Sequence, residues 1–554
     1  MSREKWLISK KYCSKECQTA HWKIHKLDCK NPLRKSAWRP AWEVEKREPH
    51  FIDSSNADES SMLSSFHHHG GMKYLWGNVP ALDLLQLDAN EGENTAQGIS
   101  LLLAASGDLR NLVKTIANLP EGFSGSLHID VNDRDEAVVA RNLILLLIAF
   151  NLPAEEASVA MLHLWYSAFL AENLAESIQA KLAPIIQEVL NSKSNESRSI
   201  GAKALEGTWS YNRATLSAEL PKKDWEKVLP SYLPGGASSI SFNDAAASMK
   251  SITLAHSRRD YRDRAMFALP PSWRLAHLKF RGDGVLLPFS ASRETFKIPN
   301  ATFFQGNLEW SMPDSANPLD GWKLEEILQT SYGAKDDVYG QLYLCVKSNL
   351  QKFCEKLATL KLDIRLFRMD AADLPYRILD GKKWYDRIEL SNIADWAYLG
   401  PGVTLSLFGP LLKPKGENPK ATLLVLFLNA THEMTTMADA ISTVGTSFEV
   451  GTRYLHLKPQ AMLSSGNPYR CELMSLTNAQ SLFREHDTPF DRFVVFSRLR
   501  EAGECLGLGM KSHHTIVEKW PMRLKKNPSQ REFDLLFWTN HVGSERYVEW
   551  HRTR

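Results

Sequence analysis

The chain has 554 residues, of which 43% are hydrophobic and 24% are charged, and its formal net charge is +3 at pH 7. This length allows two or more domains with a sizeable core, and the composition is ordinary for a globular protein in water. A net charge this close to neutral argues against binding of nucleic acid through bulk electrostatics.

Cysteine usage and hydropathy indicate a cytoplasmic or nuclear protein. The longest apolar run, residues 143–150, is much shorter than the roughly 20 residues that a membrane-spanning helix needs. The basic N-terminus lacks the apolar segment of a signal peptide. Seven cysteines in a chain of this length do not make a disulfide framework. We therefore expect no membrane partner and no specific nucleic acid partner.

Residues 74–205 alternate between strand and helix patterns, after a predicted linker over residues 31–73 that lacks apolar periodicity. The predicted elements are a strand over 99–105, a helix over 109–119, a strand over 127–131 and a helix over 136–150. This order predicts a right-handed βαβ unit in a parallel sheet.

The later part of the chain returns to this rhythm after an interruption. Residues 206–335 mix helical segments with stretches rich in proline, glycine and tryptophan, so we expect a mostly helical insertion. In residues 336–554, strands are predicted over 363–369, 385–390, 421–428, 493–496 and 532–538. The expected fold is α/β, with one mostly parallel, Rossmann-like sheet that includes both 99–133 and 363–428.

Residues 1–30 contain four potential zinc ligands: Cys13, Cys17, His25 and Cys29. Their spacing is Cys-x3-Cys, seven residues, His-x3-Cys. Thiolate and imidazole groups are the ligands that zinc prefers, and a closed structural site needs four of them. Because side chains four residues apart on a helix project from one face, both ligands of a pair can reach one ion.

The string YCSKECQTAHWKIHKLDCK closely resembles the C-terminal half of a MYND-type zinc finger, including Trp22 and the basic residues around it. In that family eight ligands bind two zinc ions in a cross-braced pattern. The resemblance implies that Cys13 and Cys17 complete one site while His25 and Cys29 complete the other. It also implies protein partners, since MYND fingers dock short proline-containing peptides.

The ligand set is only half of the family pattern, because four further cysteines are expected before the matching string. Three explanations stay open. The sequence start misses an upstream exon, or the segment is a vestigial helix that binds no metal, or the four residues regroup around a single zinc. The implied cofactor is zinc in the first and third cases.

A second resemblance covers the blocks WGNVPALDLLQL, LLLAASGDLRNLVKTI and LHIDVNDRDEAVVARNLILLLIAF. They look like a domain of unknown function found in many fungal proteins, which also forms the N-terminal part of dynein axonemal assembly factor three. The blocks RDRAMFALPPSWRL, YDRIELSNIADWAYLG and KATLLVLFLNA match more weakly. No catalytic activity is established for this family, so the resemblance favours an interaction or assembly role over an enzyme.

The same blocks also resemble the layout of a class I methyltransferase that uses S-adenosylmethionine. Gly107 and Asp108 follow the first predicted strand, where a helix N-terminus can face a ligand. Asp133 ends the second strand, where an acidic side chain can accept hydrogen bonds from ribose hydroxyls. Asp370 follows the third strand and Asp386 lies in the fourth. These five residues are the predicted cofactor-binding residues.

Structural roles compete with this interpretation. The turn AASGD has one glycine where methyltransferase loops have two or three, so its backbone approaches a cofactor less freely. Asp108 can pair with Arg110 or cap a helix, and Asp133 also suits a helix N-cap. Our leading hypothesis is a non-catalytic interaction or assembly factor, with no catalytic residue assigned. The alternative is a divergent methyltransferase or a ligand-binding pseudo-methyltransferase.

Overall fold

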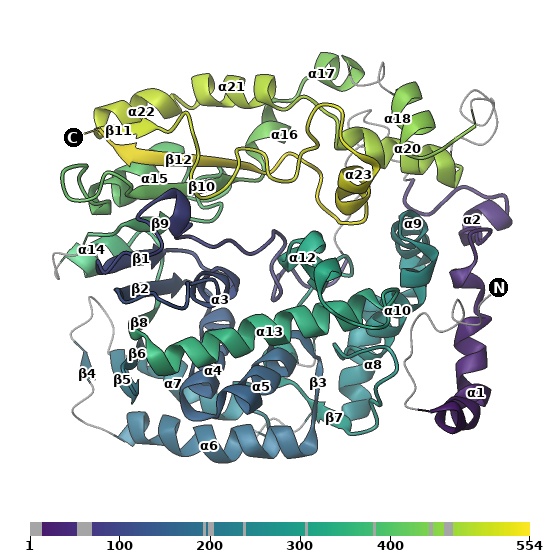
Figure 1. Ribbon diagram of the computed structural model, residues 1–554, viewed down its shortest axis with the longest axis horizontal. Coiled ribbons are helices and arrows are strands. Elements are labelled where there is room, and N and C mark those ends of the chain that lie inside the picture. The colour runs from purple at the N-terminus through teal and green to yellow at the C-terminus, as the bar shows by residue number, and fades with distance from the viewer. Residues whose placement is uncertain are drawn as a thin grey trace.

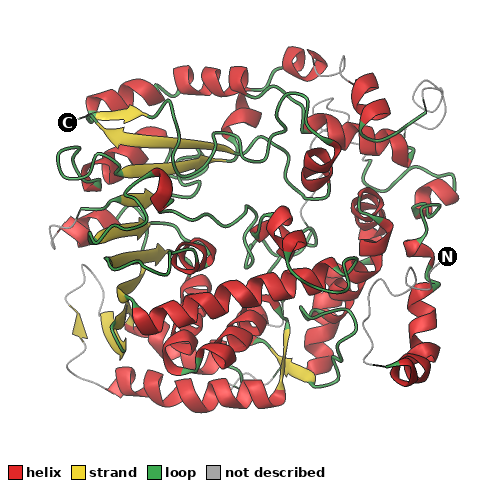
Figure 2. Ribbon diagram, viewed as in Figure 1, coloured by secondary structure: helices red, strands yellow, loops and turns green. Residues whose placement is uncertain are grey.

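A ten-stranded mixed sheet crosses the protein, with helices packed on both of its faces (Figures 1 and 2). The computed structural model describes residues 14–52, 69–191, 196–197, 204–235, 240–304, 309–379, 384–442, 447–458 and 469–553. Within those ranges, every helix is too short or too polar to cross a lipid bilayer.

The strands lie in the order β11-β12-β10-β9-β1-β2-β8-β6-β5-β4. Their bounds are β1 (Ile99–Leu103), β2 (Ser126–Asp133), β4 (Glu196–Ser197), β5 (Ala204–Tyr211), β6 (Ala214–Pro221), β8 (Lys361–Arg368), β9 (Arg387–Glu389), β10 (Thr422–Phe427), β11 (Leu508–Met510) and β12 (Arg546–Arg552). The central strands from β10 to β6 are parallel, whereas the neighbours at both ends pair antiparallel. The prediction of one mostly parallel sheet spanning 99–133 and 363–428 is confirmed.

Successive side chains of the strands alternate between two separate hydrophobic cores. Leu101, Ile129 and Ile364 belong to the larger core. Its helices are α3 (Arg110–Ala117), α4 (Glu136–Asn151), α5 (Ala154–Tyr166), α6 (Glu172–Asn191) and α13 (Val338–Thr359). Leu102 and Ile388 face the other core, with α14 (Leu374–Leu379), α15 (Pro401–Phe408), α21 (Asp487–Phe496) and α22 (Leu499–Cys505). Each fully buried side chain of this size contributes about 1.5–3 kcal/mol, so the sheet is a rigid platform.

The region predicted as a mostly helical insertion also widens the sheet. The hairpin of β5 and β6 covers 204–221, and β6 pairs in parallel with β8. The helical part includes α8 (Phe242–Thr253), α9 (Arg259–Ala268), α10 (Pro271–Asp283) and α12 (Leu324–Gln329). A short separate sheet joins β3 (Phe169–Ala171) to β7 (Phe296–Pro299).

Two predicted strands are wrong: 493–496 lies in α21, and 532–538 falls mostly within α23 (Gln530–Phe537). In α21, Phe490 and Phe493 are buried whereas Phe496 is 65% exposed, which is the spacing of a helix. A short apolar run alone does not separate helix from strand. The start of α23 is a capping box, in which Ser529 and Glu532 exchange hydrogen bonds.

Residues 31–52, which we call the N-terminal arm, pack onto the body although they fall within the predicted linker. The arm contains η2 (Pro32–Arg34) and α2 (Ala41–Val44). Trp42 and Tyr261 both make edge contacts with Phe51, at ring-centroid distances of 5.5 and 5.6 Å. Arg47 donates two hydrogen bonds, of 2.6 and 2.9 Å, to the fully buried Asp260 of α9. Aromatic burial and this ion pair hold the arm in place.

Candidate functional site

The helix α1 (Lys15–Cys29) carries three of the four predicted zinc ligands. Cys29 ends the helix and is partly buried, while Cys13 and the side chains of Cys17 and His25 fall outside the described residues. At about 1.5 Å per residue, Cys17 and His25 are about 12 Å apart along the helix axis. This is several times the ~2 Å zinc–ligand bond, so one zinc held by all four residues would require α1 to break.

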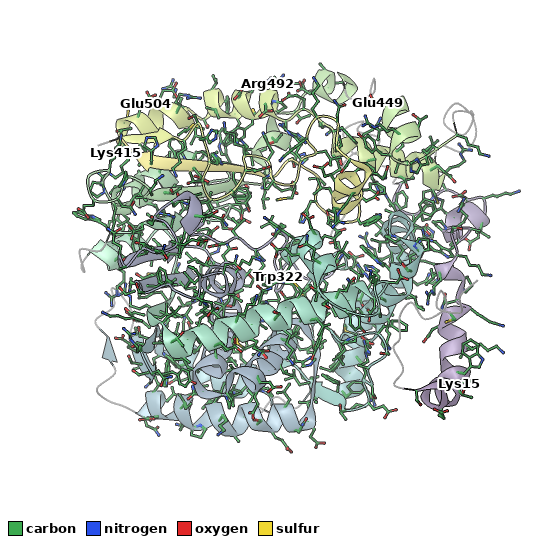
Figure 3. The ribbon with its side chains drawn as sticks, viewed as in Figure 1. Lys15, Trp322, Lys415, Glu449, Arg492 and Glu504 are labelled. Carbon is green, nitrogen blue, oxygen red and sulfur yellow. The ribbon has the colours of Figure 1, made fainter. Side chains whose placement is uncertain are left out.

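The helix α1 lies along one side of the protein, with Lys15 at the end far from the arm (Figures 1 and 3). Two large apolar side chains on it face solvent, since Trp22 is 46% exposed and Leu27 is 73% exposed. Within the described part of the chain, no three histidine, cysteine, aspartate or glutamate side chains are placed to hold a metal ion. The ligand pairs are therefore placed only by their positions in the chain, on α1 or just before it.

The turns after β1 and β2 meet at the carboxyl ends of these strands. Gly107 has a left-handed φ of +58°, and its amide donates to Asp133 Oδ2 at 2.9 Å. The other oxygen of Asp133 accepts from the Asp135 amide at 2.9 Å. Asp135, not Asp133, is the N-cap of α4 and accepts from two amides there. The structure thus brings Gly107 and Asp133 into direct contact.

Asp108 and Arg110 fill the adjacent space with a buried ion pair. Arg110 Nη1 lies 3.1 Å from Asp108 Oδ2, and the Arg110 amide donates to Asp108 Oδ1 at 3.1 Å. A Cβ added to Gly77 would lie 0.8 Å from Arg110 Nη1, and one added to Gly321 would lie 3.2 Å from its Cδ. Two loops distant in sequence therefore close over Arg110, and both need glycine at the point of contact.

Further ionisable groups surround this pair at the carboxyl ends of β1 and β9. Glu389 ends β9, and its burial raises its pKa to about 7, although Arg110 opposes the shift. Burial also lowers the pKa of Arg141 to about 9, with Asp108 opposing it. The Nε and Nη1 atoms of Arg141 find no acceptor among the described residues. Trp322, seen near the middle of Figure 3, is fully buried and donates to Tyr166 Oη at 2.8 Å.

The other two predicted cofactor residues lie elsewhere. Asp370 is exposed after β8 and accepts from the Ala372 amide at 2.9 Å in its own turn. Asp386 precedes β9, at the opposite, amino-terminal end of the parallel strands. Its carboxylate accepts from the Ser100 amide at 2.7 Å and from Lys413 Nζ at 2.8 Å. Gly107, Asp108 and Asp133 are therefore brought together, Asp370 shares their end of the sheet, and Asp386 is separated from them.

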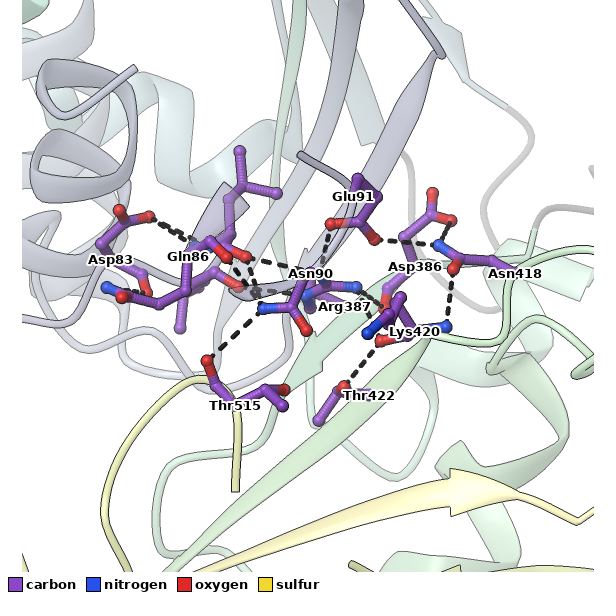
Figure 4. Close-up of polar contacts among 12 residues, drawn as sticks. Asp83, Gln86, Asn90, Glu91, Asp386, Arg387, Asn418, Lys420, Thr422 and Thr515 are labelled. Carbon is purple, nitrogen blue, oxygen red and sulfur yellow. Dashed lines mark hydrogen bonds and ion pairs between the residues drawn. The ribbon is translucent and has the colours of Figure 1, made fainter. Parts of the chain in front are cut away.

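Asp386 belongs to a polar network that sequence reasoning missed (Figure 4). Asn418 donates to both Asp386 and Glu91, at 2.7 and 3.1 Å. Glu91 pairs with the buried Arg387 at 2.6 Å, and Arg387 Nε donates to the Leu84 carbonyl at 3.1 Å. These contacts tie the segment before β1 to β9 and the loop before β10. The charged pattern YDRIELSN was the available signal, but its partners are remote in sequence.

Comparisons with known proteins identify two segments. Residues 9–29 match the MYND finger family, and residues 75–170 match the family described as Domain of unknown function (DUF4470). The second match contains β1, α3, β2, α4 and α5, hence the turns that carry Gly107 and Asp133. Neither a curated protein nor a solved structure matches the chain. The chain therefore carries a MYND finger, which implies zinc binding and protein interaction, followed by a DUF4470 domain.

Proposed function

We propose that the protein is a non-catalytic interaction or assembly factor, in which a zinc-binding MYND finger stands beside a methyltransferase-like body. The observation that carries this proposal is the closed side of the turn that follows β1. Arg110, its partner Asp108 and the loops at Gly77 and Gly321 fill that side. A cofactor there would have to displace a buried ion pair.

The order of the strands supports the methyltransferase-like description of the body. Numbered along the chain, β1, β2, β8, β9, β10, β11 and β12 lie in the order 3-2-1-4-5-7-6. A dinucleotide-binding Rossmann sheet has the order 3-2-1-4-5-6, and its ligands bind at the switch point between strands 1 and 4. An added antiparallel strand beside the fifth is typical of class I methyltransferases, and β12 pairs antiparallel with β10. The switch point here lies between β1 and β9.

A ligand-binding role is the second candidate, and one observation favours it. A Cβ added to Gly107 would meet no atom within 4 Å, so this turn is open on one side above Asp133. A nucleoside-type ligand would bind on that open side, and the ion pair of Asp108 and Arg110 would form one wall of its site. In that case the protein is a divergent methyltransferase or a pseudo-methyltransferase.

Calorimetry of the full chain with S-adenosylmethionine and S-adenosylhomocysteine separates the two candidates. The interaction role predicts no saturable heat up to millimolar ligand. Micromolar binding that disappears in Asp133→Ala but survives in Asp373→Ala, an exposed residue of the turn after β8, would overturn it. Transfer of a labelled methyl group to any acceptor would further establish an enzyme.

The finger's part of the proposal is that the pairs Cys13/Cys17 and His25/Cys29 each contribute two of the four ligands of a separate zinc site, and that the zinc-bound finger shapes a surface for proline-containing peptides. Support comes from the family match and from the four-residue spacing within each pair. Elemental analysis should find zinc that is reduced in Cys17→Ser and in Cys29→Ser. Cys505→Ser, on the exposed surface of α22, is the matched control and should keep its zinc. Equal zinc in all variants would contradict this assignment.

A further inference from the structure

A cavity of about 320 Å³ lies between the N-terminal arm and the helices α9 and α10. We call it the arm pocket, and its lining residues are Leu33, Trp38, Arg39, Ala41, Val44, Glu45, Arg259, Arg262, Asp263, Met266 and Leu278. Its volume is at the lower end of the range of about 300–1,000 Å³ for ligand pockets. Leu33 lies four residues after Cys29, so the pocket adjoins the end of the finger helix.

The wall of the arm pocket is largely apolar and partly open to solvent. Leu33, Trp38 and Met266 line it, and Val44 at α2 is 68% exposed. Exposed apolar side chains around a concavity are a common feature of sites that receive an apolar side chain from a partner. The arm itself is held by Arg47 and Asp260, so this wall is preformed.

The carboxylates of the arm pocket already have cationic partners. Glu45 lies 2.6 Å from Arg47, and Asp263 lies 3.7 Å from Arg259. Asp263 also accepts from the Ala41 amide at 3.4 Å. Arg39 is paired as well, at 3.2 Å from Glu472. The wall holds three arginines, Arg39, Arg259 and Arg262, against the two carboxylates of Glu45 and Asp263, so it has an excess of one positive charge.

Arg262 is the arginine of this wall without a close ion pair among the described residues. Its described polar contact is a long hydrogen bond of 3.4 Å from Nη1 to the Ala255 carbonyl, and it makes no ion pair with any described residue. Burial lowers the pKa of the Arg262 guanidinium, while Asp263 and Asp314 act in the opposite sense. A partly buried cation without a hydrogen-bonded carboxylate favours the binding of an anionic group.

We propose that the arm pocket binds a short acidic segment of a partner protein. An apolar side chain of that segment enters between Leu33, Trp38 and Val44, and a neighbouring carboxylate pairs with Arg262. This inference rests on the proposed interaction role and gives it a partner chemistry. The pocket belongs to the arm and the body, so it is a site separate from the zinc-dependent surface of the finger.

A defined set of fluorescent 12-residue peptides tests the proposal on the full chain. Each peptide places Leu, Phe or Ser between flanking residues that are all Glu, all Lys or all Ser, and affinities are measured by anisotropy. Peptides with Leu or Phe flanked by Glu should bind about tenfold more tightly than their Lys counterparts, since a charged hydrogen bond contributes about 1.5–3 kcal/mol. Equal affinities for the Glu and Lys peptides would overturn the proposal.

Variants assign the binding to the pocket. Arg262→Glu should reverse the preference, so that the Lys peptides bind more tightly than the Glu peptides. Val44→Glu should lower the affinity for the Glu peptides about fivefold or more, through charge repulsion at the rim of the pocket. Val44 is largely exposed, so this second variant stays informative if Arg262→Glu does not fold. Arg500→Glu makes the same charge change on the exposed surface of α22 and should leave every affinity unchanged. If Arg262→Glu still bound the Glu peptides more tightly than the Lys peptides, the assignment of this binding to the arm pocket would be wrong.

A zinc chelator separates this proposal from the role of the finger. Peptides held in the arm pocket should stay bound when zinc is removed, because none of the described residues that line the pocket is a predicted zinc ligand. Release of the Glu peptides by the chelator would place their binding on the finger instead. Cofactor binding measured by calorimetry would overturn the non-catalytic role without changing the result with these peptides.

Discussion

Arg110 and Arg262 are both removed from bulk water, but their surroundings differ in charge balance. Arg110 meets a buried carboxylate at 3.1 Å and is enclosed by the loops at Gly77 and Gly321. Arg262 lines an open cavity and has a single long backbone contact of 3.4 Å. Beyond the carboxyl ends of the parallel strands, where open α/β sheets usually bind a ligand, the charges of Arg110 and Asp108 thus neutralise each other. The wall of the arm pocket has an excess of one positive charge, and its Arg262 has no close ion pair among the described residues, so charge balance rather than fold position guides the proposed binding site.

The largest expected effect comes from removing one charge of the buried ion pair between Arg110 and Asp108. Arg110→Met should lower the free energy of unfolding by about 3–5 kcal/mol, because it leaves the buried Asp108 carboxylate without its cation. Urea denaturation at neutral pH measures this. The double variant Asp108→Asn/Arg110→Met should recover part of the loss, since neither charge is then buried alone. Equal stability of Arg110→Met and the parent would show that the pair does not hold this region closed.

The pH dependence of stability sharpens the same comparison. Burial raises the pKa of Glu389 to about 7, above its value in the unfolded chain. The fold therefore favours the protonated form, and unfolding free energy should fall as pH rises from about 4.5 to about 7. The contribution is about 3 kcal/mol when complete. Denaturation of the parent and of Glu389→Gln across this range should show a flatter profile for the variant, and identical profiles would contradict the assignment.

Two glycine substitutions compare the closed and open sides of the carboxyl end. Gly77→Ala places a Cβ 0.8 Å from Arg110 Nη1, whereas Gly107→Ala meets no atom within 4 Å. Both positions have positive φ, so backbone strain is shared and contributes about 1–2 kcal/mol to each. Gly77→Ala should be the less stable by about a further 1–3 kcal/mol because of overpacking. Equal thermal midpoints for the two variants would show that Arg110 moves aside easily.

The smallest effect is expected at the arm pocket. Arg262→Gln should change the free energy of unfolding by about 0.5 kcal/mol or less, because no ion pair among the described residues is lost. Thermal unfolding of the full chain measures this beside Arg47→Gln, which breaks the pair with the buried Asp260 and should cost about 3–5 kcal/mol. A loss at Arg262 as large as that at Arg47 would mean that its charge has a structural role.

Sequence reasoning succeeded where one short segment carries the information. The strands β1 and β2 were predicted, over 99–105 and 127–131, because their apolar runs are bounded by turn residues and followed by strongly patterned helices. The pairing of Asp108 with Arg110 was foreseen as an alternative because these residues are neighbours in the chain. The strands predicted over 493–496 and 532–538 failed because a brief apolar run is equally compatible with one face of a helix.

By itself, the sequence determined the parallel βαβ order, the glycine at the turn after β1, and the paired spacing of the zinc ligands in α1. Only the tertiary structure decided that Asp386 lies at the far end of the strands, that the arm packs on α9, and that Arg262 lines a pocket without a close ion pair among the described residues. The physical reason is that periodicity reports which face of a segment is buried. It does not report which distant segment covers that face, or whether the charges brought together there cancel.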